Sequence, residues 1–91
     1  SMTPAHLAEL QAAWPGEWRE AGNMAFLDGP KLRIGAEVAT LPNGGRWAKL
    51  HVLRPVRDVV LSQTFAGAVR ALKRRLRANI NAQARLLEAL P

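Results

Sequence analysis

Hydrophobic positions spaced three and four residues apart indicate a helix at the start of the chain. Leu7, Leu10 and Trp14 follow Thr3 and Pro4, and a Pro-Gly pair comes next. Thr is a good N-cap, Pro suits the first helical position, and Pro-Gly ends a helix. The spacing predicts a helix of about three turns that docks on a core through its apolar residues.

A longer stretch of the same spacing fills the C-terminal third. It predicts a helix from Gln63 to Leu90, about 42 Å long at about 1.5 Å per residue, with Ser62 as its N-cap. Its apolar stripe consists of Phe65, Val69, Leu72, Leu76, Ile80, Leu87 and Leu90. A domain of this size has a radius of gyration of about 12–13 Å, so the helix should outrun its own core. We expect it either to break near Asn79–Asn81 or to bury its distal residues by self-association, most simply in a two-fold dimer.

Between the two helices the pattern changes to alternation. Residues 31–38 and 46–54 each alternate apolar with polar or small positions, which predicts two antiparallel strands that are buried on one face. Short apolar runs at 24–27 and 59–61 could add another strand, although the second could also open the long helix. We therefore predict a small α+β domain: a short N-terminal helix, an antiparallel meander of two to three strands, and a long amphipathic C-terminal helix packed on one face.

The loop between the two main strands determines their register. A two-residue loop would pair Val38 with Lys49 and place a charge on the buried face. A three-residue loop over 43–45 pairs Val38 with Leu50 instead. Because a slip of one residue exchanges the two faces of a strand, we predict the odd loop. Gly45 would then have a positive φ in a G1 bulge.

Composition narrows the class of protein. The chain has 91 residues, 48% of them hydrophobic, and no Cys. We expect one domain over residues 2–91, with Ser1 as a tag remnant. The lack of Cys rules out disulfides and thiolate metal sites. No apolar run approaches the length of about 20 residues that crosses a membrane, and no secretory signal is visible. We therefore expect a cytoplasmic protein without a membrane partner.

Charge is divided unequally along the chain. Residues 1–45 contain three Lys or Arg and five Asp or Glu, whereas residues 46–91 contain ten and two, and the whole chain has a net charge of +6. A half-chain this basic repels itself unless it meets an anion. The asymmetry therefore predicts a polyanionic or acidic partner.

The densest group of cations lies on the long predicted helix and consists of Arg70, Lys73, Arg74, Arg75 and Arg77. All of these except Arg75 project within about 100° of one another, away from the apolar stripe. Such a helix face can lie in a major groove or along a phosphate backbone. Alternatively, it is only a solvated surface.

A second group of cations lies on and just beyond the predicted hairpin. Arg46, Lys49 and Arg54 accompany Trp47, whose ring could stack on a nucleobase. The alternative for Trp47 is an ordinary cross-strand contact with Leu41 or packing over the N-terminal helix. We assign both groups of cations, together with Trp47, to a candidate site for nucleic acid or an acidic partner.

Little in the sequence supports catalysis. His6 and His51 lack acid-base or metal partners at useful spacing, and the loop at 43–45 is too short to cradle a phosphate. We predict a non-enzymatic binding module without metal or cofactor that contacts a DNA or RNA backbone. The alternative is a protein-interaction module, such as a phage-type inhibitor or assembly subunit, that binds an acidic protein surface and could form a homodimer. The small size and basic composition are typical of accessory proteins of bacteria or their phages.

Overall fold

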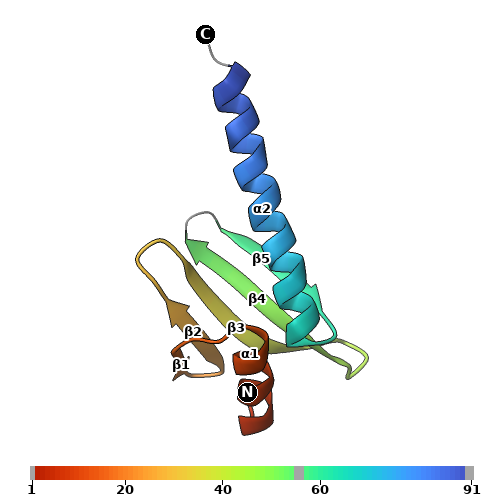
Figure 1. The fold of residues 1–91 in the computed structure, drawn as a ribbon. Coiled ribbons are helices and arrows are strands. Elements are labelled where there is room, and N and C mark those ends of the chain that lie inside the picture. The colour runs from red at the N-terminus through yellow and green to blue at the C-terminus, as the bar shows by residue number, and fades with distance from the viewer. Residues whose placement is uncertain (1, 55–56, 90–91) are drawn as a thin grey trace.

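The computed structural model describes residues 2–54 and 57–89, which form two helices and one five-stranded sheet (Figure 1). In chain order the elements are α1 (Pro4–Ala13), β1 (Trp18–Ala21), β2 (Met24–Asp28), β3 (Arg33–Thr40), β4 (Arg46–Arg54), β5 (Asp58–Ser62) and α2 (Phe65–Ala89). The strands lie in the order β1-β2-β3-β4-β5, and every neighbouring pair is antiparallel. The sheet is therefore a simple meander between two helices.

The predicted number of strands, two to three, is wrong, because the sheet has five. The sequence hides β1 because three of its four residues are exposed, so no apolar alternation marks it. A tight turn builds this strand, since Ala21 pairs with Met24 and the intervening Gly22 has a φ of +60°. Glycine at the first central position is typical of a type II′ hairpin turn. At the other edge, β5 has only five residues, too few for its pattern to exclude a helical turn.

Both helices cover the same face of the sheet, and the core lies between them and the strands (Figure 1). The buried residues of the strands alternate with more exposed ones, as a sheet covered on one face requires. The core consists of Leu10, Ala25, Ile34, Ala36, Ala48, Leu50, Val52, Val60, Phe65, Ala68, Val69 and Leu72. Within the described ranges, no helix lies on the opposite face of the sheet, which we call the outer face.

The N-terminal helix forms as predicted. The Oγ1 of Thr3 accepts a hydrogen bond from the backbone N–H of His6 at 3.2 Å, and the N–H of Thr3 donates to Nδ1 of His6 at 3.3 Å. This reciprocal pair is a capping box with His in place of the usual Glu or Gln. Leu10 is fully buried, and Leu7 and Trp14 pack against the core beside it.

The start of α2 is fixed by residues other than the expected cap. Thr64, not Ser62, caps the helix, because the Oγ1 of Thr64 accepts a hydrogen bond from the N–H of Gly67 at 3.1 Å. A second acceptor comes from α1, where Oε1 of Glu9 binds the N–H of Phe65 at 2.8 Å. A carboxylate at a helix N-terminus is favourable because it meets unpaired N–H groups and the positive end of the helix dipole. Helix α1 therefore helps to define where α2 begins.

Helix α2 runs beyond the sheet without a break. It is continuous through Asn79–Asn81, so the predicted alternative of a helix broken there is wrong. The side chains of its apolar stripe are buried as far as Leu72. Leu76 is half-buried, and Ile80 is 64% exposed. The molecule measures 51 × 30 × 20 Å and its radius of gyration is 14.7 Å, above the value expected for a compact chain of this length. The distal part of α2 causes this elongation (Figure 1).

The register of the central hairpin differs from the predicted one by two residues. Val38 lies opposite Ala48, and Leu50 lies opposite Ala36. A shift of two residues keeps each side chain on its predicted face, so the core face remains apolar. Trp47 lies opposite Ala39, so the alternative in which it pairs directly with Leu41 is wrong.

The hairpin loop explains this shift. The N–H of Leu41 donates to the carbonyl of Gly45 at 2.8 Å, and the N–H of Gly44 donates to the carbonyl of Leu41 at 2.9 Å. The odd loop is thus confirmed, but it spans Pro42 to Gly44, and Gly44 rather than Gly45 has the positive φ, +83°. Proline is favoured at the second position of a type I turn. Pro42 occupies that position, so the loop begins one residue earlier than predicted.

Gly44 is therefore the glycine whose replacement should weaken the hairpin. We expect Gly44→Val to lower the free energy of unfolding by about 1–2 kcal/mol, because L side chains are strained at this backbone conformation. The matched control is Gly45→Ala, where φ is not positive and the nearest atoms to the new Cβ belong to side chains, Oδ1 of Asn43 at 3.0 Å and Cδ1 of Leu41 at 3.5 Å. Thermal unfolding compares the two variants, and equal melting temperatures would contradict the assignment.

Candidate functional site

Four of the predicted binding residues lie exposed on α2, turned away from the sheet. They are Arg70, Lys73, Arg74 and Arg77. Helix geometry places Arg70 and Arg77 about 10 Å apart along the axis. Among the described residues, Arg70, Arg74 and Arg77 have no carboxylate within ion-pair distance. We call these three residues the arginine face.

Lys73 differs from its neighbours because it contacts α1. Its Nζ lies 5.4 Å from the centre of the Trp14 ring. A cation over an aromatic ring at this distance is attracted by the negative charge on the ring face. Lys73 therefore helps to join the two helices, and its removal would alter packing as well as charge.

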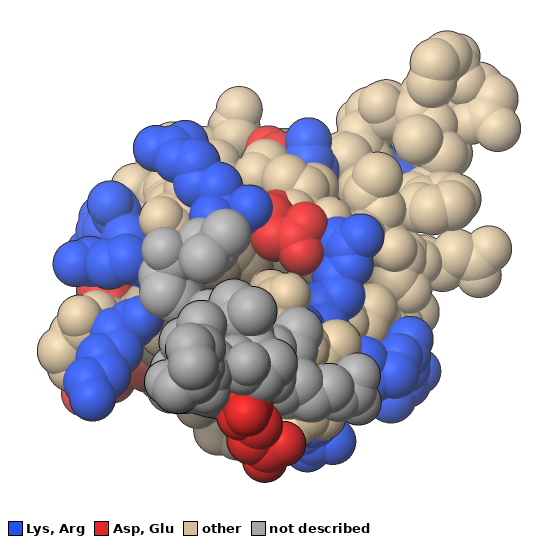
Figure 2. Space-filling model, turned by 90° about the horizontal axis from the view of Figure 1, so that it is seen from above, with Lys and Arg blue, Asp and Glu red and all other residues tan. Residues whose placement is uncertain are grey.

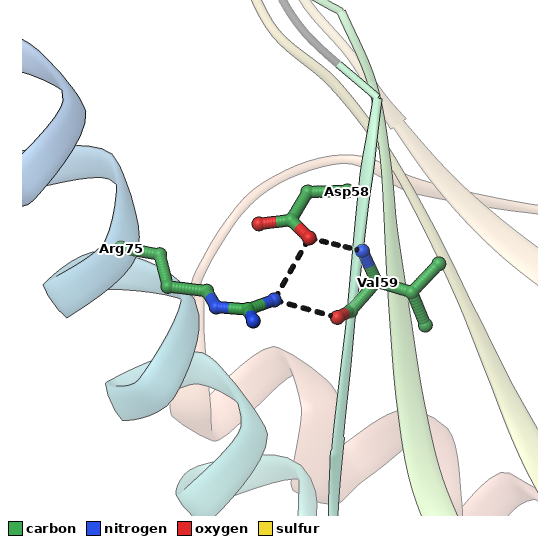
Figure 3. A network of polar contacts seen from close by, with 3 residues as sticks. All are labelled: Asp58, Val59 and Arg75. Atoms are coloured by element: carbon green, nitrogen blue, oxygen red, sulfur yellow. Dashed lines mark hydrogen bonds and ion pairs between the residues drawn. The ribbon is translucent and has the colours of Figure 1, made fainter.

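Arg75 belongs to a separate polar network that joins α2 to β5 (Figure 3). Its Nη1 lies 2.8 Å from Oδ1 of Asp58 and donates to the carbonyl of Val59 at 2.8 Å, while the same Asp58 oxygen accepts the N–H of Val59 at 2.8 Å. Strand β5 is an edge strand, and these are the groups of Val59 that β4 does not bind. The network therefore satisfies part of an open sheet edge, which natural proteins commonly protect with charged side chains.

Loss of this network should expose backbone groups at the β5 edge and lower the free energy of unfolding only slightly. The pair is largely solvent-exposed, so Arg75→Ala should reduce the free energy of unfolding by only about 0–1 kcal/mol. We expect faster aggregation on mild heating, measured by light scattering, because unpaired edge groups of Val59 become available. Arg74→Ala removes the same charge from the next residue and should aggregate no faster than the wild type. Equal aggregation of both variants would contradict an edge-protecting role.

The cations of the hairpin do not join the arginine face. Lys49 lies on the outer face, where Oε1 of Glu37 is 3.7 Å from its Nζ and 2.8 Å from Nε2 of His51. Trp47 is half-buried on the same side of β4. Arg46 and Arg54 are exposed at the two ends of that strand. Figure 2 shows Lys and Arg on several sides of the molecule, with Asp or Glu between some of them.

A cluster on the outer face was not predicted from the sequence. Asp28 lies 3.1 Å from Nη2 of Arg19 and 2.8 Å from Nε of Arg33, and both guanidinium groups lie over the Phe26 ring, 5.4 and 5.1 Å from its centre. The hydrogen bond from Arg19, with the charges of both arginines, lowers the pKa of the Asp28 carboxyl. The Arg33 contact is close but poorly aligned for a hydrogen bond, so it acts mainly through charge. The cluster forms because β1 pairs with β2, which brings Arg19 beside Phe26, and β2 pairs with β3, which brings Arg33 opposite Asp28.

Two hollows in the surface are too small for most ligands. One, of about 70 Å³, lies where α1, the β3–β4 hairpin and the start of α2 meet, and Glu9 in its wall is already bound to Phe65. The other, of about 220 Å³, lies beside His51 and Arg57. Sites for small molecules usually enclose about 300–1,000 Å³. These hollows therefore offer no site of the usual size for a small molecule.

The distal residues predicted to self-associate are only partly described. Ile80 is exposed on the part of α2 that extends past the sheet. The side chain of Leu87 and the whole of Leu90 lie outside the described residues. Self-association through this end of the helix therefore stays a prediction.

Comparison with protein-family models, curated proteins and solved structures found no significant match. Within residues 2–54 and 57–89, no helix is long and apolar enough to cross a membrane. The same residues contain no group of three or more His, Asp or Glu side chains placed to hold a metal ion. The function is therefore inferred from the side chains that the fold exposes.

Proposed function

We propose that this protein is a non-enzymatic nucleic-acid-binding module that contacts the phosphate backbone through the arginine face of α2. The observation that carries the proposal is the exposure of Arg70, Arg74 and Arg77 on one helix face without a carboxylate partner among the described residues. Solvated helix faces usually mix both signs of charge, because i,i+4 pairs stabilise the helix. A face of one sign costs self-repulsion that an anionic partner would relieve.

The chemistry of the three side chains suits phosphate. A guanidinium group presents paired N–H donors that fit two phosphate oxygens at once. Duplex DNA carries one negative charge per about 1.7 Å of its axis, so side chains spread over about 10 Å can each meet a different phosphate. Contacts of this kind fix position on the backbone and carry no base sequence, so the expected binding is independent of sequence.

The hairpin residues have a smaller part in this proposal than the sequence predicted. Lys49 is held by Glu37 on the opposite side of the sheet from α2, and Trp47 lies on that side as well. Neither side chain can share a nucleic-acid strand that lies flat on the arginine face. The proposed interface is therefore the helix alone.

The test measures binding of a labelled DNA duplex and a labelled single-stranded RNA by fluorescence anisotropy between 50 and 200 mM salt. We expect the logarithm of the duplex association constant to fall with the logarithm of salt concentration with a slope of about −2.7, which is about −0.9 for each arginine. Duplexes of different sequence should bind alike. Absence of binding at the lowest salt, or binding that salt does not weaken, would contradict the proposal. Binding of polyglutamate in place of nucleic acid would favour the acidic-protein alternative.

A further inference from the structure

The aromatic side chains of the chain, three Trp and two Phe, all belong to the described residues, and none of them lies on the arginine face. Phe65 is buried in the core. Phe26 and Trp47 lie on the outer face, on the other side of the sheet from α2. Trp18 packs against the core, and its indole N–H donates to the carbonyl of Trp14 at 2.8 Å.

Trp14 is the remaining ring, and it is held where α1 packs against α2. It contacts the core, and Nζ of Lys73 lies 5.4 Å from the centre of its ring. These contacts place the ring in the packing between the elements rather than on the surface that Arg70, Arg74 and Arg77 form. The arginine face therefore offers a nucleic acid positive charge and hydrogen-bond donors, and no ring on which a base could stack.

A contact made by charge alone favours a duplex over a single strand. Proteins that bind single strands combine a basic groove with aromatic side chains on which the bases stack. Each phosphate contact releases about 0.9 counterion from duplex DNA and about 0.7 from a single strand. For three arginines at about 0.1 M salt, the difference is about 0.6 units of the logarithm of the association constant, or about fourfold. A single strand also loses conformational freedom when it is bound, whereas a duplex is already stiff.

The shape of α2 favours the B form of the duplex. The helix continues to Ala89, and its part beyond Arg77 extends past the sheet (Figure 1). With its side chains an α-helix is about 10–12 Å across, and the major groove of B-form DNA is about 12 Å wide. Helix α2 can therefore lie along the mouth of this groove with its arginines against the phosphates at the edge. The major groove of duplex RNA is deep and narrow, so it does not accept a helix in this way.

We infer that the partner of the arginine face is double-stranded DNA in the B form, in preference to single strands and to duplex RNA. The inference rests on the proposed function, because it requires that Arg70, Arg74 and Arg77 bind phosphates. Glu88 is the only acidic residue of α2 and lies about 16 Å beyond Arg77 along the axis, so the contact ends before it.

The test compares three labelled probes of equal length by fluorescence anisotropy: duplex DNA, oligothymidine and duplex RNA. At about 0.1 M salt we expect duplex DNA to bind at least about fourfold more tightly than oligothymidine, with a salt slope of about −2.7 against about −2.1. Duplex RNA should bind more weakly than duplex DNA. Equal or tighter binding of either competitor would overturn the inference and leave the proposed function intact. Absence of binding to all three probes would overturn the proposed function itself.

A variant that adds the missing ring tests the reason for this preference. Asn81 is exposed and lies one turn beyond Arg77 on the same side of the helix. We expect Asn81→Trp to tighten the binding of oligothymidine at least about fivefold, because its unpaired bases can stack on the new ring. It should not tighten the binding of duplex DNA, whose bases are already stacked on one another.

Asn79→Trp is the matched control. Asn79 is also exposed, but helical spacing places it on the opposite side of α2 from the arginine face. This variant should leave the affinity for all three probes unchanged, and circular dichroism checks that both variants fold. Failure of Asn81→Trp to tighten oligothymidine binding, or an equal gain from Asn79→Trp, would overturn the inference, because the arginine face would then not discriminate by its lack of a stacking ring.

Discussion

Replacing Arg70, Arg74 and Arg77 together with Ala should weaken binding to duplex DNA several hundred-fold at about 0.1 M salt. Each phosphate contact releases about 0.9 counterion, so three contacts contribute about 2.7 units of the logarithm of the association constant at that concentration. The salt slope should fall towards zero. All three residues are exposed on α2, so the variant should keep its fold. Lys73 is not replaced, because losing its contact with Trp14 would change the packing of the helices as well as the charge.

The matched control removes the same charge elsewhere. Lys31, Arg46 and Arg54 are exposed outside the helices, and two of them belong to the site predicted from the sequence. Their joint replacement with Ala should change affinity by less than about tenfold, because these side chains do not lie on the proposed helix interface and salt screens charges that make no direct contact with the bound strand. If this control weakens binding as much as the arginine variant does, the attraction is a property of net charge and the arginine face has no special role.

Among these substitutions, Phe65→Ala should lower the free energy of unfolding the most. Phe65 is 1% exposed and belongs to the core at the first position of α2. Removing a buried Phe side chain costs about 3–5 kcal/mol through lost burial and the cavity that remains. Since domains of this size are stable by only about 5–15 kcal/mol, the variant should approach the limit of folding. Urea unfolding followed by circular dichroism gives the value.

Two variants test the reason for that loss. Phe65→Leu keeps most of the buried volume and should cost much less than Phe65→Ala. Ile80→Ala shortens a side chain that is 64% exposed and should change the free energy of unfolding by less than about 0.5 kcal/mol. If Phe65→Ala is no more damaging than Ile80→Ala, Phe65 does not belong to the core in solution.

Long periodic segments were predictable from the sequence, and short or edge segments were not. The spacing from Phe65 to Leu76 is enough to define α2, and the alternation around Ile34 and Leu50 defines β3 and β4. Strand β1 has one partly buried residue, Trp18, and therefore no periodic signal. The hairpin register depended on whether Gly44 or Gly45 has the positive φ. Gly44 has it, because Pro42 favours a turn that begins at Leu41.

The candidate site was predictable where it depends on one helix. The wheel of α2 correctly places Arg70, Arg74 and Arg77 on an exposed face, because helical spacing is local. The role of Arg75 was not predictable, since Asp58 reaches it only after β5 joins the sheet. Lys49 and Trp47 alternate with the buried residues of β4, so their strand face was predictable, and that face lies on the side of the sheet opposite α2.

The bond from Glu9 to Phe65 links positions 56 residues apart and has a consequence for how the chain folds. The start of α2 gains its second acceptor only after α1 has docked, and both docking surfaces exist only once the meander between them has formed. The first and last elements therefore gain their stability together, and the molecule should fold and unfold as one cooperative unit. A fusion or truncation that disturbs α1 would therefore also destabilise the first turn of α2, even though the whole sheet lies between the two helices in sequence.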